Sequence, residues 1–323
     1  MIRNLKFNLV LALMAAVLLF AGCNRSLNTK KWTTGDVVTF GRWPQTIKSE
    51  KVTITTEAKI VGAFTYFKGS DGEWYAKLAE RACRGDCTYS DGTAVGMGGT
   101  TEKYFKVEPI KWRVLIDNYN GKKLLFAENI LINCAYHDNT ASRDSFLYGK
   151  IYPNNYEESR IRAYLNGLSY EVNNRTTSET FLNKGFLQTA FTESELVLIA
   201  ETTVDNSEIS TNPDQWNNHN NPYASGRTTT DKIFLLSMQE VTTEVFGFDY
   251  DTDSTRIRVA TDFAKASGVS QSTVAGYGGC WWLRSPYYMY SSDARNVERD
   301  GTAVFGSDVR SVSGGVVPAL CIE

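Results

Sequence analysis

The segment Cys280–Pro286 places the strongest constraint on how this chain can fold. It reads Cys-Trp-Trp-Leu-Arg-Ser-Pro, a dense apolar sequence of the kind that folded proteins bury. The residues after it, Tyr-Tyr-Met-Tyr-Ser-Ser at 287–292, follow neither the helical nor the strand period. Tyrosine gives a large contact area at little cost in side-chain entropy, and serine gives adaptable hydrogen bonds, as in antibody binding loops. The junction therefore predicts a rigid framework strand that leads into a binding surface.

The N-terminus has the features of a secretory signal. Arg3 and Lys6 precede an apolar run at 9–20, which is too short for a comfortable membrane span. Gly22-Cys23 resembles a bacterial lipobox in a looser form, because Phe20 replaces the usual aliphatic residue. We expect residues 1–22 to be a lipoprotein signal peptide, Cys23 to be lipidated and 23–34 to be a polar tether. The lipid would anchor the protein to the cell surface, in the outer membrane; an ordinary signal peptide is the alternative.

Charge, cysteine and histidine content exclude several function classes. The net charge of -2 over 323 residues gives no reason to expect a nucleic-acid partner. After Cys23 an odd number of cysteines remains, so at least one has no partner within the chain. Cys280 and Cys321 lie in apolar segments and are expected to be buried thiols. The sequence holds 2 histidines, His137 and His219, in polar stretches where surface positions are expected. Neither stretch favours a catalytic triad.

Strands are predicted early in the chain and helices in its middle. A strand is expected at 37–40, and 110–115 and 123–127 flank Asn120-Gly121, a strong hairpin turn. Capping boxes, in which a glutamate follows a hydroxyl residue at the third position, begin helices at Thr192 and Ser237. Further helices are predicted over 160–165, ended by Gly167, and over 261–266, ended by Gly268.

The C-terminal part is expected to return to strands. Asp300-Gly301 predicts a two-residue hairpin between 295–299 and 302–305, and 316–322 is expected to form a final strand. The polar stretch 202–230 is predicted to be a long surface loop. The order of these elements indicates an α+β fold with polar loop insertions, in which residues 35–323 form a single domain and the terminal strands meet.

Two polar motifs allow functional hypotheses beside simpler ones. Arg84, Gly85 and Asp86 lie between Cys83 and Cys87, as in a constrained integrin-binding loop; a polar turn is the simpler alternative. The alternating acidic run at 249–253 could chelate calcium, although it lacks the glycine and glutamate of an EF-hand. A solvated acidic loop is the alternative. We expect no metal and no cofactor otherwise.

Five segments of the chain resemble motifs of one family, and they occur in the same order as in that family. They are 40–45 (FGRWPQ), 109–115 (PIKWRVL), 234–237 (FLLS), 281–286 (WWLRSP) and 315–320 (GVVPAL). They are similar to bacterial surface proteins with a C-type-lectin-like fold of the formylglycine-generating-enzyme type. With the lipobox, the chain most resembles the variable lipoproteins of treponemes, the targets of diversity-generating retroelements. The resemblance implies that 280–323 is a variable region displayed on the lectin-like fold.

Site residues are carried over from this resemblance position by position. The implied ligand-binding residues are Tyr287, Tyr288, Met289, Tyr290, Ser291, Ser292, Glu298, Arg299, Phe305, Ser307, Asp308, Arg310 and Ser311. Met289 and Glu298 are not reachable from asparagine codons by changes of adenine, so they would contact ligand without being varied. Val297, Val304 and Val309 are expected to be framework residues between them.

The sequence therefore predicts a monomeric, non-enzymatic lipoprotein that binds an extracellular protein or glycan. One alternative is an enzyme of the formylglycine-generating type that acts on exported substrates, for which Cys280 and Cys321 lie unusually far apart. The other alternative is a structural lipoprotein with an inert surface.

Overall fold

The computed structural model describes residues 29–82, 87–96, 101–145, 149–172, 177–211, 222–224, 227–249, 253–303 and 305–323. The chain divides into two compact units, Met1–Trp32 and Thr33–Glu323. The described part of the first unit holds a 3-10 helix, η2 (Thr29–Lys31). All other described elements belong to the second unit. Across these residues, no helix is both long enough and apolar enough to cross a membrane.

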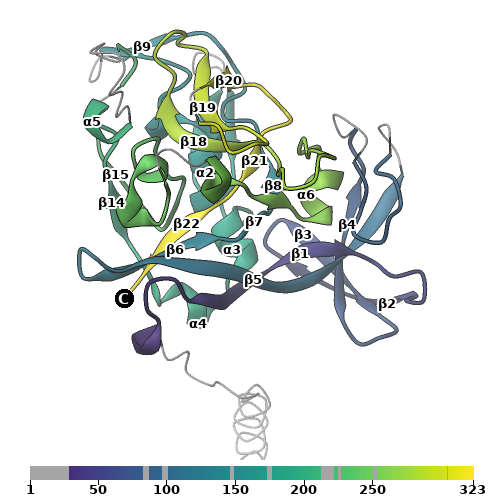
Figure 1. Ribbon diagram of the computed structural model, residues 1–323. Coiled ribbons are helices and arrows are strands. Elements are labelled where there is room, and N and C mark those ends of the chain that lie inside the picture. Colours follow the sequence, from purple (N-terminus) through teal and green to yellow (C-terminus); the bar gives the residue numbers. More distant parts are fainter. Residues whose placement is uncertain are drawn as a thin grey trace, which may run out of the picture. The chain divides into compact units, whose positions relative to one another are not determined.

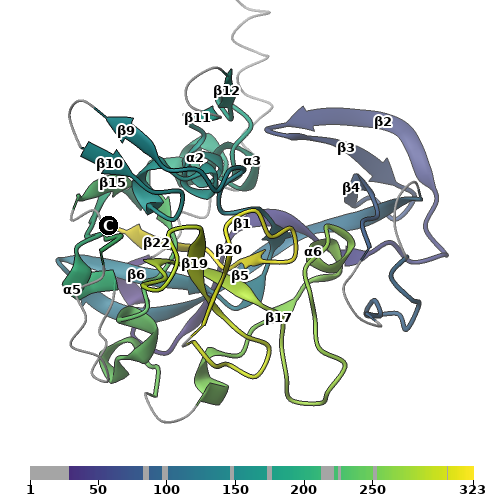
Figure 2. The ribbon, with the colours of Figure 1, turned by 90° about the horizontal axis from the view of Figure 1, so that it is seen from above.

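A large antiparallel sheet runs through the second unit (Figure 1). Over the described residues its order is β13-β22-β6-β5-β4-β3-β2, with β1 paired to β5 and β16 paired to β22. The strands are β1 (Val37–Ile47), β2 (Ile54–Val61), β3 (Phe64–Gly69), β4 (Trp74–Ala79), β5 (Glu102–Tyr119), β6 (Lys122–Ala127), β13 (Ile199–Ala200), β16 (Ile233–Phe234) and β22 (Ala319–Ile322). Seen from above, β2, β3 and β4 lie at one end of this sheet, away from β22 (Figure 2). The first and last strands of the unit thus belong to the same sheet.

A smaller sheet, here called the C-terminal sheet, contains the buried segment Trp281–Pro286. Its order in the described chain is β20-β19-β18-β21-β8, and Figure 1 shows β18, β19 and β20 above the band of β5 and β6. Its strands are β8 (Ile132–Asn133), β18 (Trp281–Pro286), β19 (Asp293–Val297), β20 (Gly306–Asp308) and β21 (Gly315–Val316). Short pairs complete the strands: β7 (Asn129–Ile130) with β17 (Val259–Ala260), β9 (Arg143–Ser145) with β10 (Gly149–Ile151), β11 (Ser169–Val172) with β12 (Thr177–Thr180), and β14 (Thr202–Val204) with β15 (Thr229–Asp231).

The helices are short and follow their predicted local signals. In α2, the Ser159 hydroxyl accepts from the Arg162 N–H, and Gly167 ends the helix at a φ of 69°. The Thr192 capping box is formed as predicted, and Thr261 caps α6. The helices are α2 (Arg160–Asn166), α3 (Phe186–Ala190), α4 (Glu193–Leu196), α5 (Glu208–Thr211) and α6 (Asp262–Ala266), with 3-10 turns η3 (Tyr156–Glu158), η4 (Glu240–Thr242), η5 (Glu244–Phe246) and η6 (Asp253–Arg256).

The predicted hairpin at Asn120-Gly121 is confirmed. β5 and β6 pair up to Tyr119 and Lys122, and both turn residues have positive φ, 52° for Asn120 and 79° for Gly121. This is the type I′ geometry that Asn-Gly favours. The pair is the centre of the large sheet, so a local signal of two residues sets the register of its longest strand.

The helix predicted after Ser237 is wrong beyond its first turn. The capping bonds exist, since the Glu240 carboxylate accepts from the Ser237 N–H and the Ser237 hydroxyl accepts from the Glu240 N–H. However, the chain continues as 3-10 turns, η4 and η5, in place of an α-helix. The hydroxyls of Thr242 and Thr243 donate to the carbonyls of Met238 and Gln239. These bonds compete with the helical backbone pattern.

Three predictions near the C-terminus and the middle loop also need correction. The chain does form a hairpin around Asp300-Gly301, since the Glu298 N–H donates to the Thr302 carbonyl at 2.8 Å and the Asn296 N–H to the Phe305 carbonyl at 3.4 Å, but the regular pairing of β19 is with β20, beyond 302–305. The predicted final strand is divided between β21 and β22, in different sheets, around Pro318, which has no N–H to donate. The ends of the expected loop 202–230 are strands, because β14 pairs with β15.

Buried tryptophans connect segments that are distant in the sequence. Trp43, Trp112, Trp281 and Trp282 are each 0% exposed. Their indole N–H groups donate to the carbonyls of Leu131 (3.0 Å), Phe40 (2.7 Å), Arg256 (3.3 Å) and Cys134 (2.9 Å) respectively. Burial of an indole is favourable only when its N–H is satisfied. Each ring therefore fixes both a packing position and a backbone position.

Arg284 connects the C-terminal sheet to residues 235–240, which lead into η4. Its side chain is almost fully buried and forms a two-pronged ion pair with Glu240, in which Nη2 donates to Oε1 at 3.0 Å. Its Nη1 also donates to the Leu235 carbonyl at 3.0 Å. The backbone follows the same path, because the Arg284 N–H donates to the Leu236 carbonyl at 3.0 Å. The arginine that the sequence places inside an apolar run is thus paired and hydrogen-bonded, as burial of a charge requires.

We predict that Arg284→Met lowers the free energy of unfolding by about 3–5 kcal/mol, because it leaves the Glu240 carboxylate buried without its counter-charge. Asp308→Asn is the matched control, since it breaks the Asp308–Arg310 ion pair, whose side chains are 44% and 57% exposed. That change should cost less than about 1 kcal/mol. Urea unfolding followed by tryptophan fluorescence measures both, and equal losses would contradict the prediction.

Candidate functional site

The predicted ligand residues occupy the connections at the two ends of β18, β19 and β20. Residues 287–292 join β18 to β19, and 298–305 join β19 to β20. Ser307 and Asp308 lie on β20, and the Val309 N–H donates to the Ser292 carbonyl at 2.9 Å. This bond brings Arg310 and Ser311 to the same end as the tyrosine loop. The structure therefore divides the predicted residues between an aromatic end and a polar hollow.

The aromatic end is built on Arg295 and Gly306. The Tyr287 and Tyr288 rings meet edge to face at 5.2 Å, and the buried Arg295 guanidinium lies 5.4 and 5.6 Å from their centres. Cation–π contacts of this kind fix the rings on the sheet. At Gly306 a Cβ would lie 2.5 Å from the Tyr287 ring, so glycine is required for the ring to pack there. Tyr287 and Tyr288 are accordingly half-buried.

The outermost part of this end is apolar and exposed. Met289 and Tyr290 are 49% and 56% exposed. Phe305, also 56% exposed, lies in the connection at the opposite end of β19 and β20. The Tyr287 hydroxyl lies 3.1 Å from the Met289 sulfur. Ser291 and Ser292 are half-buried beside them, and the Ser292 hydroxyl donates to Asp293. Large exposed side chains on an ordered loop are the arrangement that binding anchors need.

A buried amide on another segment fixes the tyrosine loop. Asn154 is 0% exposed, and its Nδ2 donates to the carbonyls of Tyr290 at 3.2 Å and Asp293 at 2.9 Å. Within the loop, the Tyr287 N–H donates to the Asp293 carbonyl and the Asp293 N–H donates to the Tyr290 carbonyl. Sequence reasoning missed Asn154, because nothing near residue 154 indicates a partner more than a hundred positions later. A preorganised loop loses less entropy when it binds.

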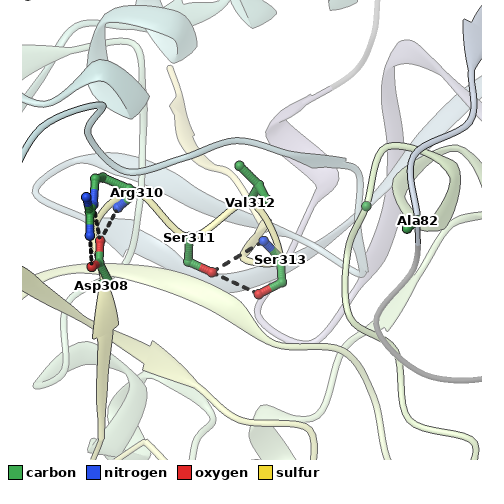
Figure 3. A pocket seen from close by; sticks show the side chains of 7 residues that line it. Ala82, Asp308, Arg310, Ser311, Val312 and Ser313 are labelled. Carbon is green, nitrogen blue, oxygen red and sulfur yellow. Dashed lines mark hydrogen bonds and ion pairs between the residues drawn. The ribbon is translucent and has the colours of Figure 1, made fainter. Parts of the chain in front are cut away.

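Charged residues near this end are paired or shielded. Asp308 and Arg310 form an ion pair at 2.8 Å, and its hydrogen bonds hold the pKa of Asp308 below its ordinary value. Burial, together with the nearby Asp308 charge, raises the pKa of Asp293. Figure 3 shows the Asp308–Arg310 pair beside Ser311, Val312 and Ser313, which line a hollow of about 480 Å³.

The polar hollow lies at the other side of the same strands and has a volume of about 130 Å³. The predicted residues that line it are Glu298, Arg299, Ser307 and Ser311. Asn296, which the sequence did not indicate, organises them: its Nδ2 donates to Glu298 at 2.6 Å and its Oδ1 accepts from Ser307 at 3.2 Å. The hollow presents hydroxyl, amide and carboxylate groups, which suit hydrogen bonding to a polar ligand.

The cysteines near the site are poorly suited to nucleophilic chemistry. Cys134, Cys280 and Cys321 are free thiols. Burial, followed by the Glu298 charge, raises the pKa of Cys280 to about 12, and burial raises the pKa of Cys321 to about 11. Reactive thiols have lowered pKa values, because the thiolate is the nucleophile. Cys321 is fully buried as predicted, whereas Cys280 is only partly buried because it borders the polar hollow.

His137 is buried, so the expectation of a surface histidine is wrong there. The His137 backbone N–H donates to the Val309 carbonyl at 2.9 Å, and the imidazole ring meets the Tyr170 ring edge to face. Burial lowers the pKa of the His137 imidazole. The residue therefore serves the framework behind the predicted variable segment, as do the fully buried Val297 and Val309.

Several predictions fall outside the described residues. These are Cys23, Val304, His219 and the Arg84, Gly85 and Asp86 loop. Cys87, which follows that loop, takes part in a disulfide. Asp251 of the acidic run is also outside, and among the described side chains no cluster of metal-ligating groups is found.

Fold and site together define a mixed protein of α+β type, with many antiparallel strands and few helices, in which a small C-terminal sheet presents ordered surface loops. Residues 120–323 match the family described as a domain of unknown function, DUF6273. The match covers more than half of the chain, and the chain belongs to this family. It starts at the β5–β6 hairpin and includes the whole candidate site. No curated protein and no solved structure matches the chain significantly.

We predict that Asn154→Ala loosens the tyrosine loop. The change removes donors to the Tyr290 and Asp293 carbonyls and should lower the free energy of unfolding by about 1–3 kcal/mol. Amide hydrogen exchange should speed up at Tyr287 and Asp293, while β5 and β6 keep their protection. Asn155→Ala, in which the neighbouring amide bonds to the Tyr223 carbonyl, is the matched control and should leave exchange at Tyr287 unchanged.

Proposed function

We propose that this protein is a lipid-anchored binding protein of the bacterial cell surface, whose segment 280–323 presents a diversifiable ligand surface. Cys23 carries the anchor, and the ligand is an extracellular protein or a glycan. The scaffold is a C-type-lectin-like fold of the formylglycine-generating-enzyme type. The mixed, mostly antiparallel architecture, with β1 and β22 in one sheet, is compatible with that fold.

The observation that carries the proposal is the contrast between fixed and exposed residues along one segment. Trp281 to Pro286 are all buried, and Ala294 to Val297 are buried again on the next strand. Between and after them, Met289, Tyr290 and Phe305 are about half exposed. A framework that stays buried while the connecting side chains face solvent can accept substitutions in those side chains at little cost in stability.

The enzyme alternative has less support. A thiol-dependent oxidoreductase needs a cysteine with a lowered pKa, and those of Cys280 and Cys321 are raised. The inert-lipoprotein alternative does not account for large apolar side chains held outward on a loop that a buried amide orders. Binding explains both observations.

We predict that replacing Met289, Tyr290 and Phe305 together by serine weakens ligand binding at least about tenfold, because exposed aromatic anchors contribute most of the binding energy at such surfaces. The measurement is capture of the mature chain on an array of glycans and extracellular-matrix proteins. The control variant replaces Ile60 and Val197 by serine; these residues are 82% and 75% exposed and lie outside the candidate site. Unchanged capture by the triple variant, or an equal loss in the control, would count against the proposal.

A second prediction concerns natural variation at this locus. In sister isolates, differences should concentrate at the predicted ligand positions other than Met289 and Glu298. Trp281, Trp282 and Val309 should stay constant, because each is 0% exposed and any change there leaves a cavity or a clash. Sequencing the locus in isolates measures this, and differences spread evenly along the chain would refute a dedicated variable surface.

A further inference from the structure

Two hollows adjoin at Val312, beside the predicted ligand surface. The outer hollow, of about 480 Å³, is lined by Asp308, Arg310 and Ser311 on one side and by Ala82 on the other (Figure 3). Gly268 also lines it. The inner hollow has a volume of about 300 Å³ and also includes Val312. Its lining continues along the chain from the outer one, with Arg81 next to Ala82 and Ser267 next to Gly268. The hollows therefore form one groove with Val312, 61% exposed, between them.

The floor of the inner hollow is apolar and rigid. Phe64, Leu78, Ile132 and Phe263 line it. Phe263 is fully buried and meets the Phe64 ring edge to face at 5.5 Å, while Phe64 and Leu78 are only half-buried. Half-buried apolar side chains over a fixed aromatic floor leave an uncovered surface that an apolar group would complete.

The rim of the inner hollow is positively charged. Arg81 is exposed, and its backbone is held where its N–H donates to the Ala266 carbonyl at 2.8 Å. Arg160, the first residue of α2, also lines the hollow, with its guanidinium 5.2 Å from the Phe181 ring centre and Nη1 3.3 Å from the Cys134 sulfur. Among the described lining residues of the inner hollow there is no aspartate or glutamate. Guanidinium groups bind carboxylates and phosphates through two parallel hydrogen bonds, and a carboxylate is the anion that a peptide carries next to an apolar side chain at its C-terminus.

We propose that the inner hollow binds the C-terminal residue of a peptide, with its apolar side chain on the phenylalanine floor and its carboxylate at Arg81 and Arg160. The rest of the peptide lies across Val312 in the outer hollow. A volume of about 300 Å³ accommodates one large apolar residue but not a folded segment. None of the predicted ligand positions lines the inner hollow, whereas Asp308, Arg310 and Ser311 line the outer one. Only the outer part of the peptide would therefore meet the proposed variable surface.

The test uses the mature chain and the peptide acetyl-Gly-Ser-Gly-Ser-Phe, with affinity measured by isothermal titration calorimetry. The free acid should bind, and its C-terminal amide should bind at least about tenfold more weakly, because the amide removes the charge at the rim. Arg81→Glu should produce a similar loss. Lys111→Glu makes the same charge change at an exposed position on β5 and should leave affinity unchanged. Leu78→Trp, which fills the hollow, should abolish binding.

The outcomes separate this proposal from the previous one. Equal affinity for the acid and the amide, or equal effects of Arg81→Glu and Lys111→Glu, would overturn the carboxylate site. Equal affinity for 3-phenylpropanoate alone would overturn a peptide as the occupant. The Met289, Tyr290 and Phe305 triple variant should bind the peptide acid as the unmodified chain does, so failure of one proposal leaves the other standing.

Discussion

The buried ion pair between Arg284 and Glu240 is the constraint on which the C-terminal half depends. It joins β18 to Glu240, the first residue of η4. Two further hydrogen bonds hold the same region: the Met238 N–H donates to the Ser285 hydroxyl, and the Tyr136 hydroxyl donates to the Arg284 carbonyl. Because a buried charge must keep its partner, β18 has one permitted position. The Trp281 and Trp282 rings then pack and donate their N–H groups at fixed carbonyls. The tyrosine loop after Pro286 is therefore positioned by the placement of β18.

The outer side chains of the loop at 287–292 face solvent because the loop backbone and the first two tyrosine rings are fixed by other residues. The Arg295 guanidinium and Gly306 seat Tyr287 and Tyr288 against the sheet, and the Asn154 amide holds the backbone of the loop. These contacts use backbone carbonyls and ring faces, which do not require a particular side chain at 289–292. The loop can therefore keep its conformation while its outward side chains differ, as a binding surface that is diversified would require.

Chemically different surfaces lie around the C-terminal sheet. The aromatic end offers exposed apolar area, the polar hollow offers hydroxyl, amide and carboxylate groups, and the inner hollow offers an apolar floor with arginines. The DUF6273 region, 120–323, supplies β18 to β22 and most of these residues. Phe64, Leu78 and Arg81 come from before it, so the inner hollow is completed by strands that the family match does not cover. Binding at the inner hollow would thus be a property of this chain and not of the matched region alone.

The sequence by itself determined the local structure and the placement of the framework. The Asn120-Gly121 hairpin, the Thr192 capping box and the Gly167 helix end follow from the conformations of a few adjacent residues. Burial of Trp281 and Trp282 was equally predictable, because apolar area of that size must leave water. Only the tertiary structure decided that Pro318 divides the last strand between two sheets and that Asn154 orders the tyrosine loop. These depend on contacts between distant segments, whose relative energies no local pattern contains.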